Sequence, residues 1–220
     1  MKLSQKTIAI FKNFNHINTN LLLQQGSLIS TRSAKKTMAA SVTVDEVFPS
    51  EFGIYDLNEF LGALLLFDTP VLEFHDKYIN ITEESNSSQR IRFYRAEKSV
   101  LIYQEKEIVF PEHQVQFTMP ASLLTNIQRS AGVLRAEVVS VIGDNGQMMV
   151  QVGKQKQEAN SYQNVIGTTD KTFKVDILIE HFKMIPGEYE VSIHPRIARF
   201  KSTTSDLVYY LAVETTSTFA

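Results

Sequence analysis

The chain has 220 residues, 43% of them hydrophobic and 21% charged, with a formal net charge of −2, which are ordinary values for a globular protein with a hydrophobic core. Cysteine is absent, which excludes disulfide bonds and thiolate metal sites and agrees with a reducing compartment. No apolar run approaches the about 20 residues that cross a bilayer, and lysines interrupt the N-terminal apolar runs, so neither a membrane span nor a signal peptide is expected.

The charge is distributed unevenly along the chain. Residues 1–44 contain no acidic residue and six basic ones, which are Lys2, Lys6, Lys12, Arg32, Lys35 and Lys36. The other 16 of the 22 basic residues stand against all 24 acidic residues, so the remainder has a net charge of −8. Such a basic segment is either a solvated surface or, if its charges share one face, a binding surface for a polyanion.

The first predicted element is an amphipathic helix that begins after Ser4, a residue that favours the N-cap position. Apolar or small residues recur at helical spacing on one side, at Leu3, Thr7, Ile10, Phe11, Phe14 and Ile17. The opposite side and its flanks are polar or basic, with Gln5, Lys12, His16, Lys2, Lys6 and Asn13. This outward face has no acidic residue.

Extended segments and a second short helix complete the first half. A hairpin is expected from Leu21–Gln24 to Leu28–Arg32, and a helix over Leu57–Phe67 with Leu57, Phe60, Leu61 and Leu64 as its apolar stripe. The strands that close this half are predicted at Val71–Phe74, Tyr78–Thr82 and Gln89–Tyr94. The charged, extended stretch Ala96–Gln114 then predicts a connector, with domains at residues 1–110 and 111–220.

The second half repeats this order. A helix is predicted between Pro120 and Gly132, with Leu123, Leu124, Ile127 and Ala131 on its apolar side and Ser122, Thr125 and Arg129 opposite. A hairpin follows from Ala136–Ile142 to Gln147–Val152, with a strong turn signal at residues 143–146. A short helix is expected over Ile177–Ile185, and strands at Tyr189–His194, Ile197–Lys201 and Leu207–Glu214. The repeat predicts an α+β protein of two similar domains.

No motif for catalysis is visible. The chain has no phosphate-binding glycine loop, no nucleophile elbow and no zinc-protease helix, and its five histidines lack metal-ligand spacing. The nearest polar cluster, Glu73–Asp76, is explained by an exposed strand end, and Asp144–Gly146 lacks the later ligands of a calcium loop. We therefore expect no enzymatic activity, no cofactor and no metal.

Several segments together resemble a known family. They are Met1–Ser4 with Lys12–Phe14, Ile54–Asn58 with Phe60–Gly62, Lys183–Met184 with Pro186–Tyr189, and Tyr209–Glu214 with Ser217 and Thr218. In order and spacing they resemble the DNA polymerase sliding clamps of T-even-type bacteriophages, over essentially the whole chain. The resemblance implies the DNA-clamp fold, with two helices per domain on curved antiparallel sheets.

The resemblance also implies a function. Three subunits would close head to tail into a ring around double-stranded DNA, with helices lining the hole and sheets outside, and the ring would hold a DNA polymerase on its template. It implies loading by an ATP-dependent clamp loader, a role as a late-transcription coactivator, and a location on DNA in the cytoplasm of the infected bacterial host. Edge strands somewhere in Gln89–Tyr103 and near Ser161–Ile166 would join the subunits.

Site residues follow by position from the resemblance. The main candidates for contact with DNA are Lys6, Lys12, Arg129 and Lys183, with Lys2, His16, Lys35 and Lys36 in second rank. The helix Leu57–Phe67 has no basic residue on its outer face, so a uniform basic lining is not expected. A hydrophobic pocket for partner peptides is expected at Val109, Phe110, Pro111, Tyr210, Leu211 and Val213, each of which could instead be an ordinary strand residue that fills a core.

Two other functions fit parts of the sequence. The main alternative is a β-rich structural or assembly protein of a virion, whose basic N-terminal segment binds another protein. The second is a small hydrolase with carboxylates that no motif reveals. Trimer formation and retention on circular DNA would distinguish a clamp from both.

Overall fold

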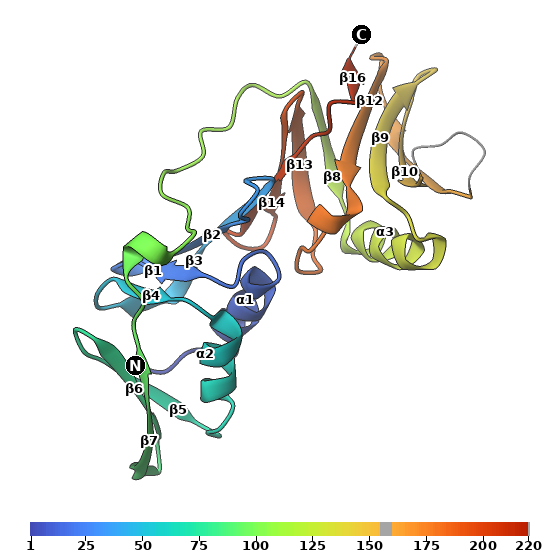
Figure 1. Cartoon of the computed structure of the whole chain (residues 1–220). Helices are drawn as coiled ribbons and strands as arrows, with labels where there is room; N and C mark the ends of the chain where they lie inside the picture. The colour runs from blue at the N-terminus through green and yellow to red at the C-terminus, as the bar shows by residue number, and fades with distance from the viewer. Residues whose placement is uncertain (155–159, 220) are drawn as a thin grey trace. The chain divides into compact units, whose positions relative to one another are not determined.

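A computed structural model describes residues 1–154 and 160–219 (Figure 1). The chain forms two compact units, Met1–Glu107 and Ile108–Ala220, and their boundary falls inside the predicted connector. The described strands pair antiparallel, and three α-helices accompany them, so the predicted α+β class is confirmed. None of the described helices is both long and apolar enough to cross a membrane.

The first unit contains two helices and three groups of strands. The helices are α1 (Gln5–Asn15) and α2 (Leu57–Leu64). The strands are β1 (Leu21–Leu23), β2 (Gly26–Arg32), β3 (Met38–Phe48), β4 (Phe52–Ile54), β5 (Pro70–Phe74), β6 (Tyr78–Glu83) and β7 (Asn86–Tyr94). Strand β1 pairs with β4, β2 pairs with β3, and β5, β6 and β7 form a sheet in that order.

The predicted hairpin between Leu21–Gln24 and Leu28–Arg32 is wrong. All three residues of β1 are buried, and they pair with Phe52–Ile54 across the unit. Strand β2 instead turns back through residues 33–37 and pairs with β3. A short run without alternation cannot identify its partner, because a fully buried strand exposes no face. The predicted strands of the β5–β7 sheet are confirmed.

Helices α1 and α2 lie side by side and cover the core of the first unit (Figure 1). The buried face of α1 consists of Thr7, Ile10, Phe11 and Phe14, as the helical period predicts. Phe11 meets Phe60 of α2 edge to face at 6.2 Å between ring centroids, and Phe60 meets Phe93 of β7 at 5.1 Å. The aromatic side chains therefore join both helices to the sheet.

The N-terminus of α1 is capped twice. The Ser4 hydroxyl accepts a hydrogen bond from the Thr7 amide, and the Glu46 carboxylate on β3 accepts from the Ser4 amide and, at 2.6 Å, from the Thr7 hydroxyl. Burial of Glu46 opposes its ionisation, but these hydrogen bonds outweigh burial and hold the pKa of Glu46 below its ordinary value of 4.5. Glu46 thus links the start of α1 to β3.

A pH dependence of stability follows from this link. Because the folded-state pKa of Glu46 is lowered, its contribution is fully present above about pH 4.5 and is lost as the pH falls through the lower folded-state pKa. Glu46→Gln is expected to lower the free energy of unfolding by about 1 kcal/mol at pH 7. Near pH 3 the free energies of unfolding of the variant and the wild type should become similar. Urea unfolding at the two pH values measures this difference, and a gap that widens toward pH 3 would contradict it.

The second unit contains α3 (Ala121–Leu134) and strands in two sheets. The strands are β8 (Val115–Met119), β9 (Val138–Asp144), β10 (Gln147–Gly153), β11 (Tyr162–Thr168), β12 (Phe173–Leu178), β13 (Tyr189–His194), β14 (Ile197–Ser202), β15 (Val208–Ala212) and β16 (Thr218–Phe219). One sheet has the order β11-β10-β9-β12-β16, and in the other β15, β14, β13 and β8 are neighbours. The predicted β9–β10 hairpin is confirmed, with positive φ at Asn145 and Gly146 in its turn.

Helix α3 buries Leu123, Leu124, Ile127 and Ala131, as predicted, but it does not end at Gly132. The helix runs to Leu134, and Arg135 adopts the left-handed conformation that ends it, with φ of 48°. Gly132 therefore lies in the last turn, exposed to solvent. A glycine marks a helix end only when the backbone there needs positive φ, and here Arg135 takes that position.

Gly132→Ala is expected to stabilise the protein. A Cβ at Gly132 would meet no atom within 4 Å, and alanine loses less backbone entropy than glycine on folding. We expect the free energy of unfolding to rise by about 0.5–1 kcal/mol, measured by urea denaturation. Gly143→Ala is the contrasting variant, because its Cβ would lie 2.5 Å from the Phe173 ring and must destabilise the hairpin. Equal effects of the two substitutions would disprove this explanation.

The helix predicted over Ile177–Ile185 is wrong. Strand β12 continues to Leu178, and only a 3-10 turn, η2 (Ile179–His181), follows it. Ile177 and Leu178 pair with Val139 and Val138 of β9, so ladder hydrogen bonds and burial outweigh the short helical pattern. With Pro186 close behind, too few residues remain for a stable helix.

The two units nevertheless repeat one plan. Strand β4 pairs with β1 and leads through α2 into the β5–β6–β7 meander. In the same way β12 pairs with β9 and leads through η2 into the β13–β14–β15 meander. The turn η2 therefore occupies the place in the second unit that α2 occupies in the first.

Candidate functional site

The exposed face of α1 is basic. Lys6, Lys12 and His16 are all exposed, while the opposite face of the helix is buried. The helix has no acidic residue, and neither Lys6 nor Lys12 forms an ion pair with any residue in the described part of the chain. Lys12 stands in the last turn, where the helix dipole favours a cation. This face is available to a polyanion.

Helix α3 presents a comparable face in the second unit. Arg129 is exposed opposite the buried stripe, together with Ser122, and α3 also has no acidic residue. Arg129 forms no ion pair within residues 1–154 and 160–219. Each unit therefore has one acid-free helix with an exposed cation, as the sequence predicts. Contact of these cations with DNA stays a prediction.

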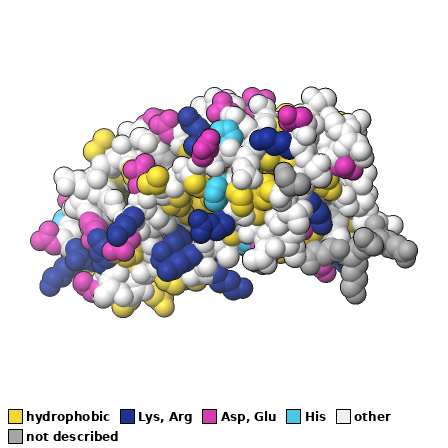
Figure 2. All heavy atoms as spheres, turned by 90° about the horizontal axis from the view of Figure 1, so that it is seen from above, with side chains coloured by type: hydrophobic (Ala, Val, Ile, Leu, Met, Phe, Trp, Pro, Cys, Tyr) yellow, Lys and Arg dark blue, Asp and Glu magenta, His cyan; other side chains and the backbone are white. Residues whose placement is uncertain are grey.

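The other basic candidates have different surroundings. Lys2 pairs with Glu84, an interaction that competes with any phosphate. Lys35 and Lys36 are exposed in the turn between β2 and β3, where Lys36 has φ of 60°. Lys183 is exposed, but it follows η2 in an irregular segment instead of the helix that was predicted for it. On the face drawn in Figure 2, Lys and Arg side chains are interspersed with Asp and Glu.

The predicted partner pocket separates into surface and core residues. Phe110 and Tyr210 are half-buried, and their rings lie 6.3 Å apart. Leu211 has no exposed surface, because alternation along β15 places it beside Ala198 on the core side of the sheet. Leu211 is therefore a core residue, and its assignment to a partner surface is wrong. Val109 is 89% exposed, Pro111 is exposed, and Val213 is half-buried.

The first part of the connector is held by the first unit. The Asn18 side-chain amide donates to the carbonyls of Arg32 and Ile102, and Asn20 accepts from the Ile102 amide at 2.9 Å. A Cβ at Gly53 would collide with the Ala96 carbonyl, so this glycine permits the close approach of the connector to β4. The connector is thus fixed to the first unit as far as Ile102, and Phe110 packs within the second.

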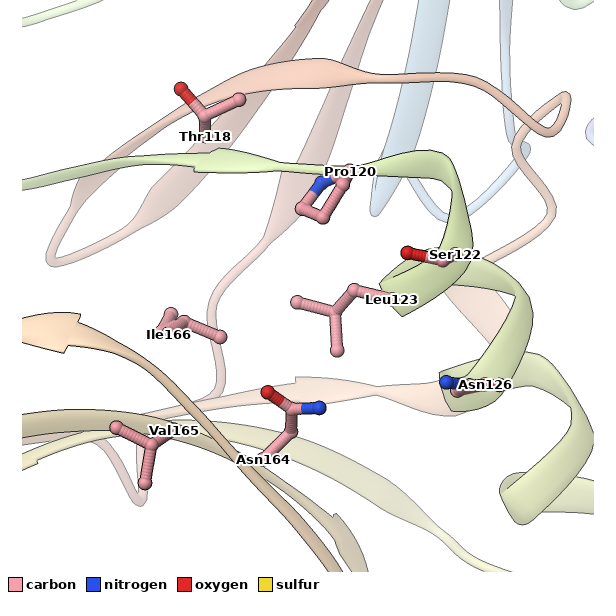
Figure 3. Close-up of a pocket in the computed structure, with 8 residues that line it drawn as sticks. All are labelled: Thr118, Pro120, Ser122, Leu123, Asn126, Asn164, Val165 and Ile166. Atoms are coloured by element: carbon pink, nitrogen blue, oxygen red, sulfur yellow. The ribbon is translucent and has the colours of Figure 1, made fainter.

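Each unit has a long strand at the edge of a sheet that pairs on one side within the described chain. These strands are β7 in the first unit, which pairs with β6, and β11 in the second, which pairs with β10. Beside β11 is a hollow of about 330 Å³ between that strand and the start of α3. Leu123 of α3 and Asn164 and Ile166 of β11 face each other across it (Figure 3). Val165 of β11 is 59% exposed. A free edge next to a hollow lined by both polar and apolar side chains is suited to strand pairing with another chain.

The polar cluster at Glu73 has the character of a solvated sheet surface. Asn80 donates to Glu73 at 3.2 Å and contacts His75 at 3.1 Å. The hydrogen bond from Asn80, followed by the contact of His75 with the carboxylate, lowers the pKa of Glu73, whereas a carboxyl that acts as a general acid needs a raised pKa. Among the described residues no group of three His, Asp or Glu could hold a metal ion.

Arg199 is a functional candidate that the sequence did not indicate. Arg199 of β14 lies opposite Tyr210 in the ladder, and its guanidinium carbon is 4.7 Å from the centre of the Phe110 ring. Strand alternation could have placed Arg199 on the outer face of the sheet. Its proximity to Phe110 could not be derived, because the two residues are far apart in sequence.

The chain is similar to known proteins over nearly its whole length. A family model for the DNA polymerase processivity factor matches residues 2–103. The chain is 30% identical over 231 residues to the sliding clamp of Escherichia phage RB69, covering 99% of both chains. It is 28% identical over 232 residues to the sliding clamp of Enterobacteria phage T4, covering all of both. The sliding clamp of Vibrio phage KVP40 is 27% identical over 97% of this chain and 99% of its own.

Solved structures agree with the fold. Proliferating cellular nuclear antigen of Entamoeba histolytica superposes with a TM-score of 0.69 at 14% identity, over 94% of each chain. DNA polymerase III subunit beta of Borrelia burgdorferi superposes with a TM-score of 0.70 at 9% identity, over 96% of this chain and 63% of that one. These likenesses confirm the DNA-clamp fold, and with the phage relatives they show that the chain belongs to the sliding clamps of T-even-type bacteriophages, which are DNA polymerase processivity factors.

Proposed function

We propose that three copies of this chain close into a ring around double-stranded DNA and that the exposed faces of α1 and α3 meet the DNA backbone. The observation that supports this most directly is the pair of acid-free helices, one in each unit, with Lys6, Lys12 and Arg129 on their outward faces. Cations that neutralise phosphates attract DNA of any sequence and lose that attraction as salt rises. Such weak contacts suit a ring that slides.

The ring would form through the free edges of β7 and β11. Strand β7 of one subunit would pair with β11 of the next, and the hollow beside β11, which both polar and apolar residues line, would receive side chains from the neighbour. A head-to-tail contact of this kind closes when the rotation per subunit is right, and three two-unit subunits give six similar units around the hole. The unpaired edges and the internal repeat of the chain support this arrangement.

The ring would hold a DNA polymerase near its template. A tethered enzyme that releases DNA is recaptured quickly, because its effective local concentration stays high. We propose that the polymerase and an ATP-dependent clamp loader dock at Phe110 and Tyr210, with Val109, Pro111 and Val213 beside them, and that the ring also serves late transcription. The clamp itself would perform no reaction, and it would act on DNA in the cytoplasm of an infected bacterium.

The oligomeric state of the protein and its retention on circular and on linear DNA test this proposal together. Light scattering should give about 75 kDa, three times the 25.0 kDa of the chain. After loading with the cognate loader, the protein should remain on nicked circular DNA and leave the same DNA within minutes once it is cut to linear form. Equal retention on the two forms would exclude encirclement. A monomer that binds neither form would favour the virion-protein alternative.

A further inference from the structure

The sheet of β5, β6 and β7 in the first unit has one buried face and one open face. Ile79 and Ile81 of β6 and Phe93 of β7 are buried, and Phe93 meets Phe60 of α2. Because side chains alternate along a strand, the intervening ones point away from this core. They form the open face of the sheet, which consists of Glu73, His75, Tyr78, Arg90, Arg92 and Tyr94.

Aromatic rings occupy one end of the open face. Tyr78 and Tyr94 are directly opposite each other in the β6–β7 ladder, with ring centroids 5.9 Å apart. The His75 ring lies against Tyr78 at 4.6 Å, and the guanidinium carbon of Arg92 is 4.4 Å from the centre of the Tyr78 ring. Tyr78 is therefore half-buried, whereas Tyr94 is 64% exposed. An exposed ring on a sheet offers a planar surface for stacking.

Two cations stand beside these rings. Arg90 and Arg92 are two residues apart on β7, so they lie on the same face with their Cα atoms about 7 Å apart. Both are exposed, and neither forms an ion pair with any residue that the structure describes. Contact with Tyr78 orients the Arg92 guanidinium, and the N–H groups at the edge of a guanidinium can still bind an anion.

The acidic side chain on the open face already has partners. Glu73 accepts a hydrogen bond from Asn80 at 3.2 Å, and His75 Nε2 lies 3.2 Å from the same carboxylate oxygen. The pKa of Glu73 is lowered first by the hydrogen bond from Asn80 and last by the charge of Arg90, which forms no ion pair with it. Arg90 and Arg92 therefore leave the open face with two cations that favour an anionic ligand.

The combination of cations and an exposed ring indicates which anion fits. Duplex DNA presents phosphates, but its bases are stacked inside the helix and cannot reach a ring on the protein surface. An acidic peptide presents carboxylates without a planar ring at each charge. A single DNA strand presents a phosphate and an unstacked base at every nucleotide, so it fits both features. The spacing of Arg90 and Arg92 along β7 is also comparable with that of neighbouring phosphates in an extended strand.

We propose that the open face of the β5–β7 sheet binds single-stranded DNA. One base stacks on Tyr94, and Arg90 and Arg92 pair with neighbouring phosphates. This site goes beyond the proposed function, which assigns duplex DNA to the faces of α1 and α3 and does not require it. The edge of β7 stays free to pair with a neighbouring subunit, because these side chains stand perpendicular to the sheet. A polymerase copies single-stranded template, so a processivity factor meets this ligand.

Photo-crosslinking to the full-length protein tests where the strand binds. The probe is a thymidine dodecamer with one 5-iodouracil in the middle, a base that crosslinks to an aromatic ring stacked on it. Trypsin cleaves after Arg92 and after Arg95, so a crosslink to Tyr94 is recovered in the peptide of residues 93–95. We expect this peptide to be the main crosslinked product at about 50 mM salt, where phosphate contacts are strong. Crosslinks confined to peptides of α1 or α3 would overturn the proposal.

Matched variants separate stacking from charge. Tyr94→Leu should weaken binding of the dodecamer about tenfold in fluorescence anisotropy, whereas Tyr94→Phe, which keeps the ring, should change it less than about twofold. Arg90→Gln with Arg92→Gln should also weaken binding about tenfold and reduce the slope of log binding constant against log salt concentration by about 1.4. Arg196→Gln with Lys201→Gln removes two exposed cations from the β13–β14 hairpin of the second unit and should change binding less than about twofold.

Two further ligands decide what occupies the open face. A dodecamer with the same phosphate chain but no bases should bind about tenfold more weakly than the thymidine strand, because it cannot stack on Tyr94. Equal binding of the two would reduce the site to a charged surface and overturn the proposal. An acidic peptide of equal charge that binds more tightly than the DNA strand would assign the open face to a partner protein, which would overturn it as well.

Folding and assembly are checked on the same proteins. Because the substituted side chains are exposed, melting temperatures should stay within about 5 °C of the wild type, and light scattering should still give trimers. Loss of strand binding only in variants that also lose the trimer would make the effect one of assembly and overturn the proposal. A wild-type protein that is retained on circular DNA but does not bind the dodecamer saturably would also overturn it, although the proposed function would stand. A crosslink at residues 93–95 in a protein that forms no trimer would support this inference and contradict the proposed function.

Discussion

Replacing Lys12 and Arg129 together by glutamate is expected to abolish retention on circular DNA and processive synthesis. The two side chains lie on acid-free exposed helix faces, one in each unit, so a trimer would lose six cations and gain six anions. Each lost phosphate contact makes DNA binding less dependent on salt. The loss of six contacts would reduce the slope of log binding constant against log salt concentration by about 5. Like-charge repulsion inside the ring would also oppose loading.

The controls for this experiment come from the internal repeat. Lys77 and Arg196 occupy the first turn of the two meanders, between β5 and β6 and between β13 and β14, and both are exposed. Lys77→Glu with Arg196→Glu makes the same change in net charge away from α1 and α3, and it should leave synthesis near the wild-type level. Melting temperatures should show that all variants fold, since exposed substitutions cost within about 1 kcal/mol. Normal long-product synthesis by the helix variant would make the DNA-facing assignment wrong.

Asp176→Ala is expected to give the largest loss of stability among the polar substitutions. Asp176 is 1% exposed, and its carboxylate accepts hydrogen bonds from the hydroxyls of Ser140 at 2.6 Å and Thr216 at 2.9 Å. Lys174 lies 3.3 Å from the same carboxylate. Hydrogen bonds to a charged group contribute about 1.5–3 kcal/mol, and two hydroxyls would be left without their acceptor. We expect a loss of about 3 kcal/mol in the free energy of unfolding.

The effect of Asp176→Ala should reach the C-terminal segment. The Asp176 backbone amide donates to the Ser217 hydroxyl, the Glu214 amide donates to the Asp176 carbonyl, and β16 pairs with the start of β12. Amide hydrogen exchange should therefore accelerate in residues 214–219 more than in α3. Asp170→Ala, at an exposed position before the same strand, is the control and should change stability by less than about 0.5 kcal/mol. Uniform acceleration throughout the unit would contradict a local role in holding this segment.

Helix faces and hairpin turns could be predicted from the sequence because their signals are local. The stripes of α1 and α3 follow from a repeat of 3.6 residues, and each stripe identifies the outward residues Lys12 and Arg129 by elimination. The turn at Asn145 and Gly146 follows from the positive φ that those residues tolerate. The prediction failed where the sequence pattern was short. Leu21–Leu23 gave no indication of the strand it pairs with, and the pattern around Ile177 fitted a helix as well as a strand.

Residues a few positions apart decide the fold class, the internal repeat and the side of each long helix that faces the core, so these features can be derived from the sequence. Tertiary structure alone decided which residues far apart in sequence meet. Pairing with β9 made Ile177 a strand residue, the register of β15 moved Leu211 into the core, and packing of the connector placed Phe110 on Arg199. Strand register and burial depend on the whole chain, because a shift of one residue exchanges the two faces of a sheet.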